Sequence, residues 1–478
     1  MNMKRIAIIG VGVTGISVLK EMAAHDYYQN FEIVLFNEPR TLGTGVPYQD
    51  DSELLLINQT ADTMSLEEED KYDFVKWVQV NKDSTAGNKD FIPRKWYGEY
   101  LKEKLKSAVA ILNPTIIQEN VEAIRVLKDG RYHIESASTQ GEFDKVHLCT
   151  GQLPYQDPYH LKDHPHFVYH PYPVEEKLSH FPEGSRIGVI GTGLTSIDLM
   201  RFLRNQNKKF TLGFFARNAH FSLYRGLEYD KDLKFLTPEN VEKEKQLHAG
   251  FVPFSKILEW FHLECQDKGI DFQDLTYRFG KGSKEQLNHL LEENTDLGVL
   301  QGIIHKLDFY LADLMAALTQ EDRELFYTDY EPLFRHFRTP MPKESLERLM
   351  DAWNSGEIQV WENMEAVEML EERFKVKLED EEVEVDYLIN ATGQNQILTN
   401  SELPTDLLGQ LINERILQPE TFGGVQVLWP GAEAISQRYG VLHNFYVHGQ
   451  LVIGLQYGNN AHLLMKQARK VVRNDLTK

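Results

Sequence analysis

The sequence predicts an α/β protein made of two similar domains, with the second domain inserted in the first and an additional helical insertion. Two glycine-rich loops support this prediction: GVGVTG begins at Gly10, and GTGLTS occupies residues 191–196. A Gly-x-Gly-x-x-Gly string is informative only where it joins a strand to a helix. Both loops follow an apolar run typical of a buried strand and precede a helical pattern. Each loop therefore predicts a Rossmann-like βαβ unit that binds a dinucleotide.

The first loop has the residues that the pyrophosphate of a dinucleotide requires. Gly10 allows a tight turn, Gly12 lets the backbone approach the pyrophosphate, and Gly15 lets the helix pack closely on the strand. Thr14 lies where the start of the helix offers N–H groups to phosphate oxygens. The next apolar run, FEIVLFNE, ends at Glu38, 23 positions after Gly15. A carboxylate that binds a ribose hydroxyl is expected about 20 residues after such a loop.

The second loop repeats this frame with two differences. Gly191 and Gly193 keep their places, but Ser196 takes the third position, where it is small enough for close helix packing. The following strand, FTLGFFAR, ends at Arg217, 21 positions after Ser196. An arginine near this point can bind the 2′-phosphate of NADP. An exposed arginine at a strand end is the alternative interpretation.

An internal repeat strengthens the pairing of the two loops. ENVEAIRVLKDGRYHIE leads to DKVHLCTG after the first loop, and ENMEAVEMLEERFKVKLED leads to VDYLINATG after the second. The spacing also agrees, with 27 positions from Ile124 to Gly151 and 26 from Val367 to Gly393. The chain is therefore predicted to hold two copies of a nucleotide-binding domain. Two such sites suggest electron transfer between one permanently bound dinucleotide and one that visits.

The chain resembles the flavoproteins with two dinucleotide-binding domains. Within them it resembles a bacterial FAD/NAD(P)-binding family related to the flavin-dependent monooxygenases. The resemblance covers nearly the whole chain except the segment near 230–330, and collectively its motifs are specific. The matching stretches are IAIIGVGVTG, GTGVPY at 43–48, FIPRKWYGEYL at 91–101, LCTG at 148–151, IGVIGTGLTSIDL at 187–199, LINATG at 388–393 and FYVHGQLVIG at 445–454.

The resemblance implies that the first loop holds the pyrophosphate of FAD. Gly43 and Gly45 would lie along the flavin, and Gly449 would let a helix N-terminus approach it. Arg94, which precedes Tyr97 and Tyr100 in a helical pattern, would face phosphate, because a guanidinium suits phosphate oxygens; an ordinary surface salt bridge is the alternative. Asn37 stands where the family's acid usually follows the strand, with Glu38 next. The remaining candidate cofactor-binding residues are Gly151 and Gly393 at the ends of the repeated segments.

The repeat also predicts the domain organisation. Residues 1–165 and 389–478 would form the FAD-binding domain, and residues 184–388 the NAD(P)H-binding domain. The segment 230–330 shows helical periodicity and is predicted as a helical insertion that caps the active site or mediates dimerisation. His336 and Arg338 follow it in a predicted loop, LFRHFRTPMP, that could face NADPH phosphates or a substrate carboxylate, or could be an ordinary exposed loop.

Composition limits the class of protein. A net charge of −21 opposes binding to nucleic acids and anionic membranes, and no run approaches the ~18 apolar residues of a membrane-spanning helix. The two cysteines, Cys149 and Cys265, form no Cys-x-x-Cys, which argues against a disulfide reductase. The 17 histidines form no convincing metal-binding pattern, so no metal is predicted. The basic stretch KQARKVVR at 466–473 is interpreted as the solvated face of a terminal helix. The protein is expected in the cytoplasm, with a homodimer as the candidate assembly.

These observations predict an FAD-dependent oxidoreductase that uses NADPH, with NADH as the alternative. The resemblance implies a monooxygenase that acts on a small molecule through a flavin hydroperoxide, and no residue is identified as a catalytic acid or base. Two alternatives remain at this stage. One is an NAD(P)H-dependent reductase that inserts no oxygen, and the other is a non-catalytic dinucleotide-binding protein.

Overall fold

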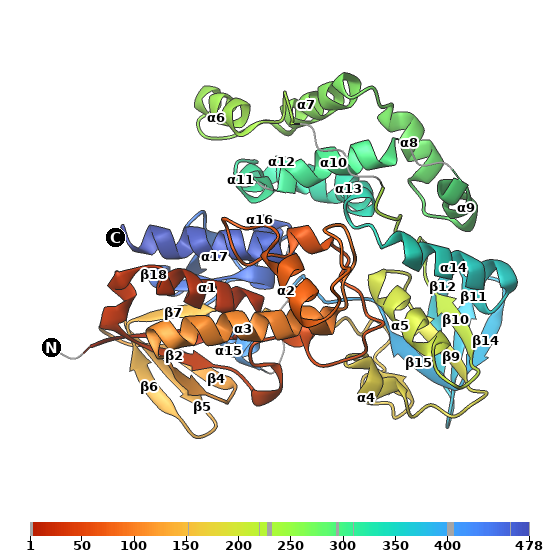
Figure 1. The fold of residues 1–478 in the computed structure, drawn as a ribbon, viewed down its shortest axis with the longest axis horizontal. Coiled ribbons are helices and arrows are strands. Elements are labelled where there is room, and N and C mark those ends of the chain that lie inside the picture. The colour runs from red at the N-terminus through yellow and green to blue at the C-terminus, as the bar shows by residue number, and fades with distance from the viewer. Residues whose placement is uncertain are drawn as a thin grey trace.

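The computed structural model contains two parallel sheets and a layer of helices (Figure 1). The structure describes residues 3–151, 153–218, 220–226, 232–292, 296–308, 310–398, 406–458 and 460–477. No helix in these ranges is both long and apolar enough to cross a membrane.

The first sheet is built mainly from the N-terminal part of the chain and is completed by the C-terminal part. Its described strands are β1 (Lys4–Ile9), β2 (Phe31–Phe36), β3 (Thr115–Ile117), β7 (Lys145–Leu148), β16 (Val427–Leu428), β17 (Glu433–Ser436) and β18 (Gly440–Val447). They lie in the order β16-β17-β18-β7-β1-β2-β3, and the neighbours from β18 to β3 are parallel. The apolar runs of β1 and β2 are buried on both faces, as expected for central parallel strands.

Helices cover one face of this sheet. They are α1 (Val13–Ala23), α2 (Asp73–Asn81), α3 (Arg94–Leu112) and α17 (Ala461–Asp475), and their apolar side chains form one core with those of β1 and β2. The other face carries α15 (Leu407–Asn413) and a three-stranded antiparallel sheet of β4 (Val121–Val126), β5 (Tyr132–Ser136) and β6 (Gln140–Phe143). The short helix α16 (Ile453–Gln456) precedes α17.

The second sheet repeats the centre of the first. Its strands are β8 (Phe167–Val168), β9 (Arg186–Ile190), β10 (Thr211–Phe215), β11 (Ile358–Trp361) and β15 (Tyr387–Asn390), all parallel in the order β11-β10-β9-β15-β8. On one face lie α4 (Val174–Leu178), α5 (Leu194–Arg204) and α14 (Lys343–Ser355). The other face packs on an antiparallel sheet of β12 (Met364–Met369), β13 (Phe374–Leu378) and β14 (Glu382–Val385).

Equivalent hydrogen bonds confirm that the two units are copies of one fold. The amide of Gly10 donates to the carbonyl oxygen of Phe36 at 2.9 Å, and that of Gly191 donates to Phe215 at 2.8 Å. Arg5 and Asp144 bond across β1 and β7, as Arg186 and Asp386 do across β9 and β15. In each pair the arginine amide donates to an aspartate carboxylate oxygen at 2.8 Å. In both units the antiparallel sheet precedes the strand that ends in Thr-Gly, which confirms the predicted repeat.

The predicted helical insertion is helical. Figure 1 shows its helices as a layer of their own beside the two sheets, with the end of the layer near α16 and α17. Its first positions, 230 and 231, lie outside the described residues, and its helices continue past residue 330. They are α6 (Pro238–Leu247), α7 (Phe254–Asp267), α8 (Phe272–Phe279), α9 (Lys284–Glu292), α10 (Leu297–Asp308), α11 (Leu311–Ala316), α12 (Gln320–Leu325) and α13 (Glu331–Arg338).

The strand pairing places the boundaries of the second domain at different residues from those predicted. Strand β8 pairs in the second sheet although it precedes the predicted start of the second domain at residue 184. Strand β15 also pairs there although it crosses the predicted end at 388. Sequence reasoning missed β8 because two strand residues between prolines and histidines carry no periodicity. The division into an FAD-binding and an NAD(P)H-binding domain stays a proposal, with the second domain extended to about residues 167–390.

Candidate active site between the two glycine loops

A cavity of about 560 Å³ begins at the first glycine loop and reaches the second unit and the helical layer. Gly10, Gly12, Thr14, Gly45 and Gly151 of the predicted set line it. The second unit contributes Leu194, the first residue of α5, and the insertion contributes Arg338 at the end of α13. Residues of both glycine loops and of the insertion therefore meet at one cavity.

The first loop is shaped by close backbone contacts. Gly10 has φ +91°, and a Cβ there would lie 2.4 Å from the carbonyl oxygen of Cys149. A Cβ at Gly15 would lie 2.0 Å from the carbonyl oxygen of Gly10, so the turn and the start of α1 leave no space for a side chain. A Cβ at Gly12 would lie 3.2 Å from Cα of Gly45, which brings two loop backbones together at the cavity wall. The contacts of Gly10 and Gly15 agree with the tight turn and the close helix packing predicted for them, and the approach of a pyrophosphate to Gly12 stays a prediction.

Asn37, and not Glu38, faces the cavity. Its side-chain oxygen accepts a hydrogen bond from the amide of Val11 at 2.7 Å, and its side-chain nitrogen donates to the hydroxyl of Thr41 at 3.1 Å. The Glu38 carboxylate accepts from the same hydroxyl at 3.0 Å and does not line the cavity. Asn37 takes this wall position because the residue directly after β2 points toward the loop, and the contact of Glu38 with a ribose stays a prediction.

Gly43 and Gly449, two other predicted glycines of the first unit, do not line the cavity but lie next to residues that do. Gly43 donates its amide to the carbonyl oxygen of Val11 at 2.9 Å and packs on α3, so it does not line the cavity. Gly449 is buried, with φ +69° and a Cβ position 3.2 Å from the hydroxyl oxygen of Thr14. Its neighbour Gln450 lines the cavity. Gly449 thus packs against the start of α1, and the prediction that it approaches flavin stays a prediction.

The second loop is more open than the first. Gly191 has φ +113° and lies close to the carbonyl oxygen of Ala391, as Gly10 does to Cys149, but a Cβ at Gly193 would meet nothing within 4 Å. Ser196 is fully buried and donates its hydroxyl to the carbonyl oxygen of Gly193 at 2.6 Å. Gly393 has open space around its Cα, and the next residue, Gln394, lines the cavity.

Arg217 is the second residue after β10, as Glu38 is after β2. Its side chain is exposed, and no ion pair of its guanidinium is found among the residues that the structure describes. An exposed cation at the end of this strand is available to a 2′-phosphate. The predicted NADP contact stays a prediction that the geometry permits.

Arg94 lines the cavity, but its guanidinium is committed to the protein. Its Nη1 lies 2.8 Å from Oδ2 of Asp198 on α5, and its Nε donates to the carbonyl oxygen of Leu56 at 2.9 Å. Tyr172 donates its hydroxyl to the same Asp198 oxygen at 2.6 Å. Arg94 thus forms a buried ion pair, because α3 directs it toward the second unit, and its contact with phosphate stays a prediction. A smaller cavity of about 180 Å³ borders this pair.

Burial and charge oppose each other in this ion pair. Burial alone would lower the pKa of Arg94, but Asp198 and Tyr172 raise it above its ordinary value. Burial raises the pKa of Asp198, while Arg94 and the Tyr172 hydroxyl act in the opposite direction. The pair links the first unit to the second at the cavity wall, and removing either charge would leave the other buried without a partner.

The segment containing His336 and Arg338 is the end of a helix rather than the predicted loop. His336 is directed away from the cavity, with its Nε2 2.9 Å from the carbonyl oxygen of Phe279, and burial lowers its pKa. Arg338 ends α13 and lines the cavity. Only Arg338 of the two therefore reaches the candidate site.

Sequence reasoning singled out Asn37 but missed the other side-chain amides on the cavity wall. No aspartate or glutamate lines the cavity among the described residues. Gln394 and Gln450 directly follow Gly393 and Gly449, so the two motifs could have indicated them, whereas the others carry no motif. The amide side chains are those of Asn37, Asn58, Gln59, Gln394, Gln396, Gln450 and Asn460.

Cys149 is the one cysteine among the described residues that line the cavity. Burial raises the pKa of this thiol, so it stays protonated at neutral pH. Cys265, the second cysteine, is buried in the insertion. Neither residue offers the thiolate that disulfide exchange requires.

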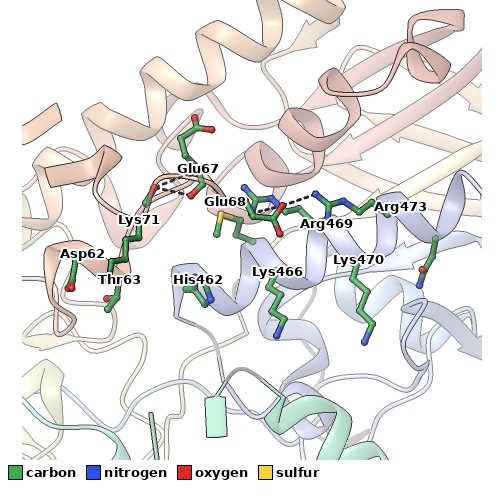
Figure 2. Close-up of a pocket in the computed structure, with 13 residues that line it drawn as sticks. Asp62, Thr63, Glu67, Glu68, Lys71, His462, Lys466, Arg469, Lys470 and Arg473 are labelled. Carbon is green, nitrogen blue, oxygen red and sulfur yellow. Dashed lines mark hydrogen bonds and ion pairs between the residues drawn. The ribbon is translucent and has the colours of Figure 1, made fainter. Parts of the chain in front are cut away.

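A second cavity, of about 530 Å³, lies along α17 (Figure 2). Residues 61–65 and the first turn of α17 separate the two, since Met64 and Leu464 line the first while Thr63 and Met465 line the second. Figure 2 shows Lys466 and Lys470 pointing away from the Glu68 side of α17. The basic stretch at 466–473 lies on the terminal helix, as predicted, with Lys466 and Arg473 exposed, and its cations line this cavity. Its cations are largely paired, for example Arg473 with Glu68 at 2.7 Å and Lys470 with Asp313 at 2.9 Å.

The residues present fit a dinucleotide at the first cavity. Gly10, Gly12 and Gly45 have no side chains, so the loop backbone and the start of α1 stay accessible from the cavity. Asn37 lies at the end of β2, where a ribose contact is expected. A metal would find less support, since no group of three or more His, Cys, Asp or Glu in the described ranges is arranged to hold one.

Comparisons with known proteins agree with this geometry. Residues 7–153 match a family model described as FAD-NAD(P)-binding. No curated protein sequence matches the chain. Among solved structures, ornithine hydroxylase from Pseudomonas aeruginosa has a TM-score of 0.63 at 12% identity, over 99% of this chain and 98% of that one.

Two further structures share the fold over both full chains. An ornithine N-hydroxylase from Kutzneria, solved with reduced FAD, NADP⁺ and L-ornithine, has a TM-score of 0.57 at 12% identity, covering 100% of this chain and 99% of that one. Bacillithiol disulfide reductase from Staphylococcus aureus has a TM-score of 0.53 at 12% identity, with the same coverage.

The fold and the family match define the class of protein. Residues 7–153 form a domain of the FAD/NAD(P)-binding type, and the whole chain shares the fold of these two-domain structures. The predictions of the fold class and of an FAD/NAD(P)-binding domain at the first glycine loop are confirmed at this level.

Proposed function

We propose that the protein is an FAD-dependent, NADPH-using monooxygenase that acts on a small molecule. The single observation that carries the proposal is the cavity shared by both units: Gly12 of one loop, Leu194 at the start of the other unit's helix, and Arg338 of the insertion line it together. Two dinucleotides bound at the two loops would extend toward this one space. Hydride transfer and substrate oxidation would take place there.

The chain's own residues would bind the cofactor and orient the reacting groups. The loop at Gly10–Gly15 and the start of α1 would hold the FAD pyrophosphate, and Asn37 would hold the loop in place through Val11. When bound, FAD supplies hydride acceptance and reaction with oxygen. The Arg94–Asp198 pair would keep the two units in register, so that the reacting groups stay within reach.

The site favours oxygen insertion over disulfide reduction. Cys149 is the thiol at the cavity, it has no partner cysteine within two positions in the chain, and burial raises its pKa. The neighbours with higher TM-scores are named hydroxylases, and they supply further support. NADPH over NADH is proposed from Arg217. The cytoplasmic location and the homodimer stay predictions.

Turnover in the presence of labelled oxygen tests the proposal. The purified protein is expected to carry FAD, to oxidise NADPH faster than NADH, and to incorporate one atom of ¹⁸O₂ into a small-molecule product. Hydrogen peroxide is measured in parallel without substrate, because uncoupled oxidation of NADPH would release it. NADPH oxidation with an artificial acceptor, but with no labelled product from any candidate substrate, would support the reductase alternative. Absence of FAD reduction would support a non-catalytic binding protein.

A further inference from the structure

Arg338 is the cation of the cavity whose guanidinium is only partly used by the protein. Its Nε donates to Oδ1 of Asp308 at 2.8 Å, and its side chain is 12% exposed. Among the residues that the structure describes, Nη1 and Nη2 have no hydrogen-bond acceptor. This differs from Arg94, whose guanidinium bonds to Asp198 and to a backbone carbonyl. Arg338 therefore presents two terminal nitrogens on the wall of the cavity.

The surrounding residues hold this guanidinium in place. Asp308 at the end of α10 is 9% exposed and fixes the Nε side. The guanidinium carbon lies 5.5 Å from the centre of the Tyr457 ring, and Tyr457 has φ +59°, a conformation that non-glycine residues rarely adopt. A Cβ at Gly458 would lie 2.5 Å from Nη2, so a side chain at this position would displace the guanidinium of Arg338. The site thus orients Arg338 from three sides.

The charges on the cavity wall indicate which kind of ligand the oriented Arg338 can bind. Its described lining has two arginines, many amides and no carboxylate, in a chain of net charge −21. A cationic amine would find no counter-charge on this wall. An anionic group would find Arg338, because a guanidinium with two free terminal nitrogens matches the two oxygens of a carboxylate.

We propose that Arg338 binds the carboxylate of an anionic small-molecule substrate, and that the helical insertion thereby selects the substrate. The inference rests on the proposed function, since it places the substrate in the cavity shared by the two loops. It also gives the insertion a role: α13 carries the recognising group, and α10 supplies the aspartate that orients it. The phosphates of NADPH are the competing anion, because Leu194 of the second loop lines the same cavity.

Calorimetric titration of the FAD-loaded protein tests this role without turnover. The probes are hexanoate and benzoate, each compared with its uncharged amide, hexanamide or benzamide. The wild-type protein is expected to bind the carboxylates roughly 10- to 100-fold more tightly than the amides, the range for a lost hydrogen bond to a charged group. Arg338→Met should abolish this preference. Arg335→Met on the same helix, 63% exposed and outside the cavity lining, should leave it unchanged.

Two further variants keep the test independent of folding. Arg338→Lys retains a charge beside Asp308 but loses the two terminal nitrogens of the guanidinium. Gly458→Ala keeps Arg338 and Asp308 but displaces Nη2, and its Cβ would also lie 2.5 Å from Cδ1 of Leu463. Both should weaken carboxylate binding with FAD content near wild type, and Arg338→Lys should also keep the wild-type melting temperature. NADP⁺ affinity, titrated in parallel, separates the two sources of an anion.

The outcomes are distinct. Equal binding of carboxylate and amide, or no binding of either by the wild-type protein, would overturn the proposal. So would an Arg338→Met variant that loses NADP⁺ affinity but keeps the carboxylate preference, since Arg338 would then be a phosphate-binding residue. Failure of the proposed monooxygenase function would instead appear as missing FAD or missing labelled product in wild-type protein, and would leave the calorimetric preference measurable.

Discussion

The two glycine loops have the same backbone frame but different surroundings. In the first, Gly15 cannot accept a side chain, because its Cβ would lie 2.0 Å from the carbonyl oxygen of Gly10. In the second, Ser196 occupies the equivalent position and its hydroxyl donates to Gly193 at 2.6 Å. The backbone at Gly12 is closed in by Gly45, whereas open space surrounds Gly193.

This difference teaches how one fold can serve two kinds of dinucleotide. Several residues of the first loop line the cavity, together with many residues around them. In the second loop, Leu194 is the one described residue that lines it. A loop enclosed on several sides suits a cofactor that stays bound, and an open loop suits one that binds and leaves in each cycle. We therefore expect the first unit to bind FAD tightly and the second to exchange NADP(H).

Breaking the link between the two units should have the largest effect. Asp198→Ala leaves Arg94 buried without its partner, which is expected to lower the free energy of unfolding by about 3–5 kcal/mol. Chemical denaturation of the FAD-loaded protein measures it. Asp386→Ala is the matched control, because its pair with Arg186 is about one-third exposed and should contribute less than about 1 kcal/mol. Equal losses in the two variants would contradict a special role of the buried pair.

Adding a methyl group to each loop tests the comparison directly. Gly15→Ala should destabilise the protein by about 1–3 kcal/mol or more and reduce its FAD content, because the turn must move away from the added Cβ. Gly193→Ala should change stability by less than about 1 kcal/mol, because its Cβ meets nothing within 4 Å. Melting temperature and flavin absorbance report both effects. A large loss of stability in Gly193→Ala would show that the second loop is as crowded as the first.

The first sheet buries a titratable pair where the second is apolar. His147 on β7 is fully buried, its Nδ1 lies 3.0 Å from Nε2 of His448, and the equivalent residue of β15 is Ile389. Burial and nearby Lys145 lower the pKa of His147 to about 3. The unfolded chain thus binds more protons below pH 6.5, so stability falls as the pH falls.

Replacing that histidine by its counterpart should flatten the pH dependence. His147 contributes a slope of about 1.4 kcal/mol per pH unit from about pH 6.5 downward, and this contribution is fully present above that pH. In His147→Ile the slope of unfolding free energy between pH 6.5 and pH 5 should decrease by this amount. Denaturation at several pH values measures it, and an unchanged slope would show that His147 is protonated in the folded state.

The smallest expected effect concerns cofactor choice at the second loop. Arg217→Ala should reduce the preference for NADPH over NADH roughly ten-fold, a change of about 1.4 kcal/mol, because the 2′-phosphate would lose one cation. Dissociation constants for NADP⁺ and NAD⁺ measure it. Arg204→Ala, at the far end of α5 and paired with Glu357, is the control. An unchanged preference in Arg217→Ala would place the phosphate contact elsewhere.

Local patterns explain which site residues the sequence could indicate. Gly10, Gly12 and Gly15 follow from the strand–turn–helix pattern alone, since the close contacts that require glycine involve neighbouring parts of the same motif. Arg94 was placed correctly on a helix at the cavity, but its partner Asp198 lies 104 positions away on another domain. A helix pattern fixes which face a side chain occupies and leaves open what that face meets.

The sequence by itself determined the two copies of the fold, the glycine turns and the helical nature of the insertion. Each depends on local periodicity and on steric limits within a few residues. Tertiary structure alone decided that Asn37 rather than Glu38 faces the cavity, that Arg94 pairs with Asp198, and that Arg338 reaches the site from the end of α13. These contacts join segments distant in the chain, and burial removes water as a competing partner, so the geometry of the packed units selects which charges pair and which stay available to a ligand.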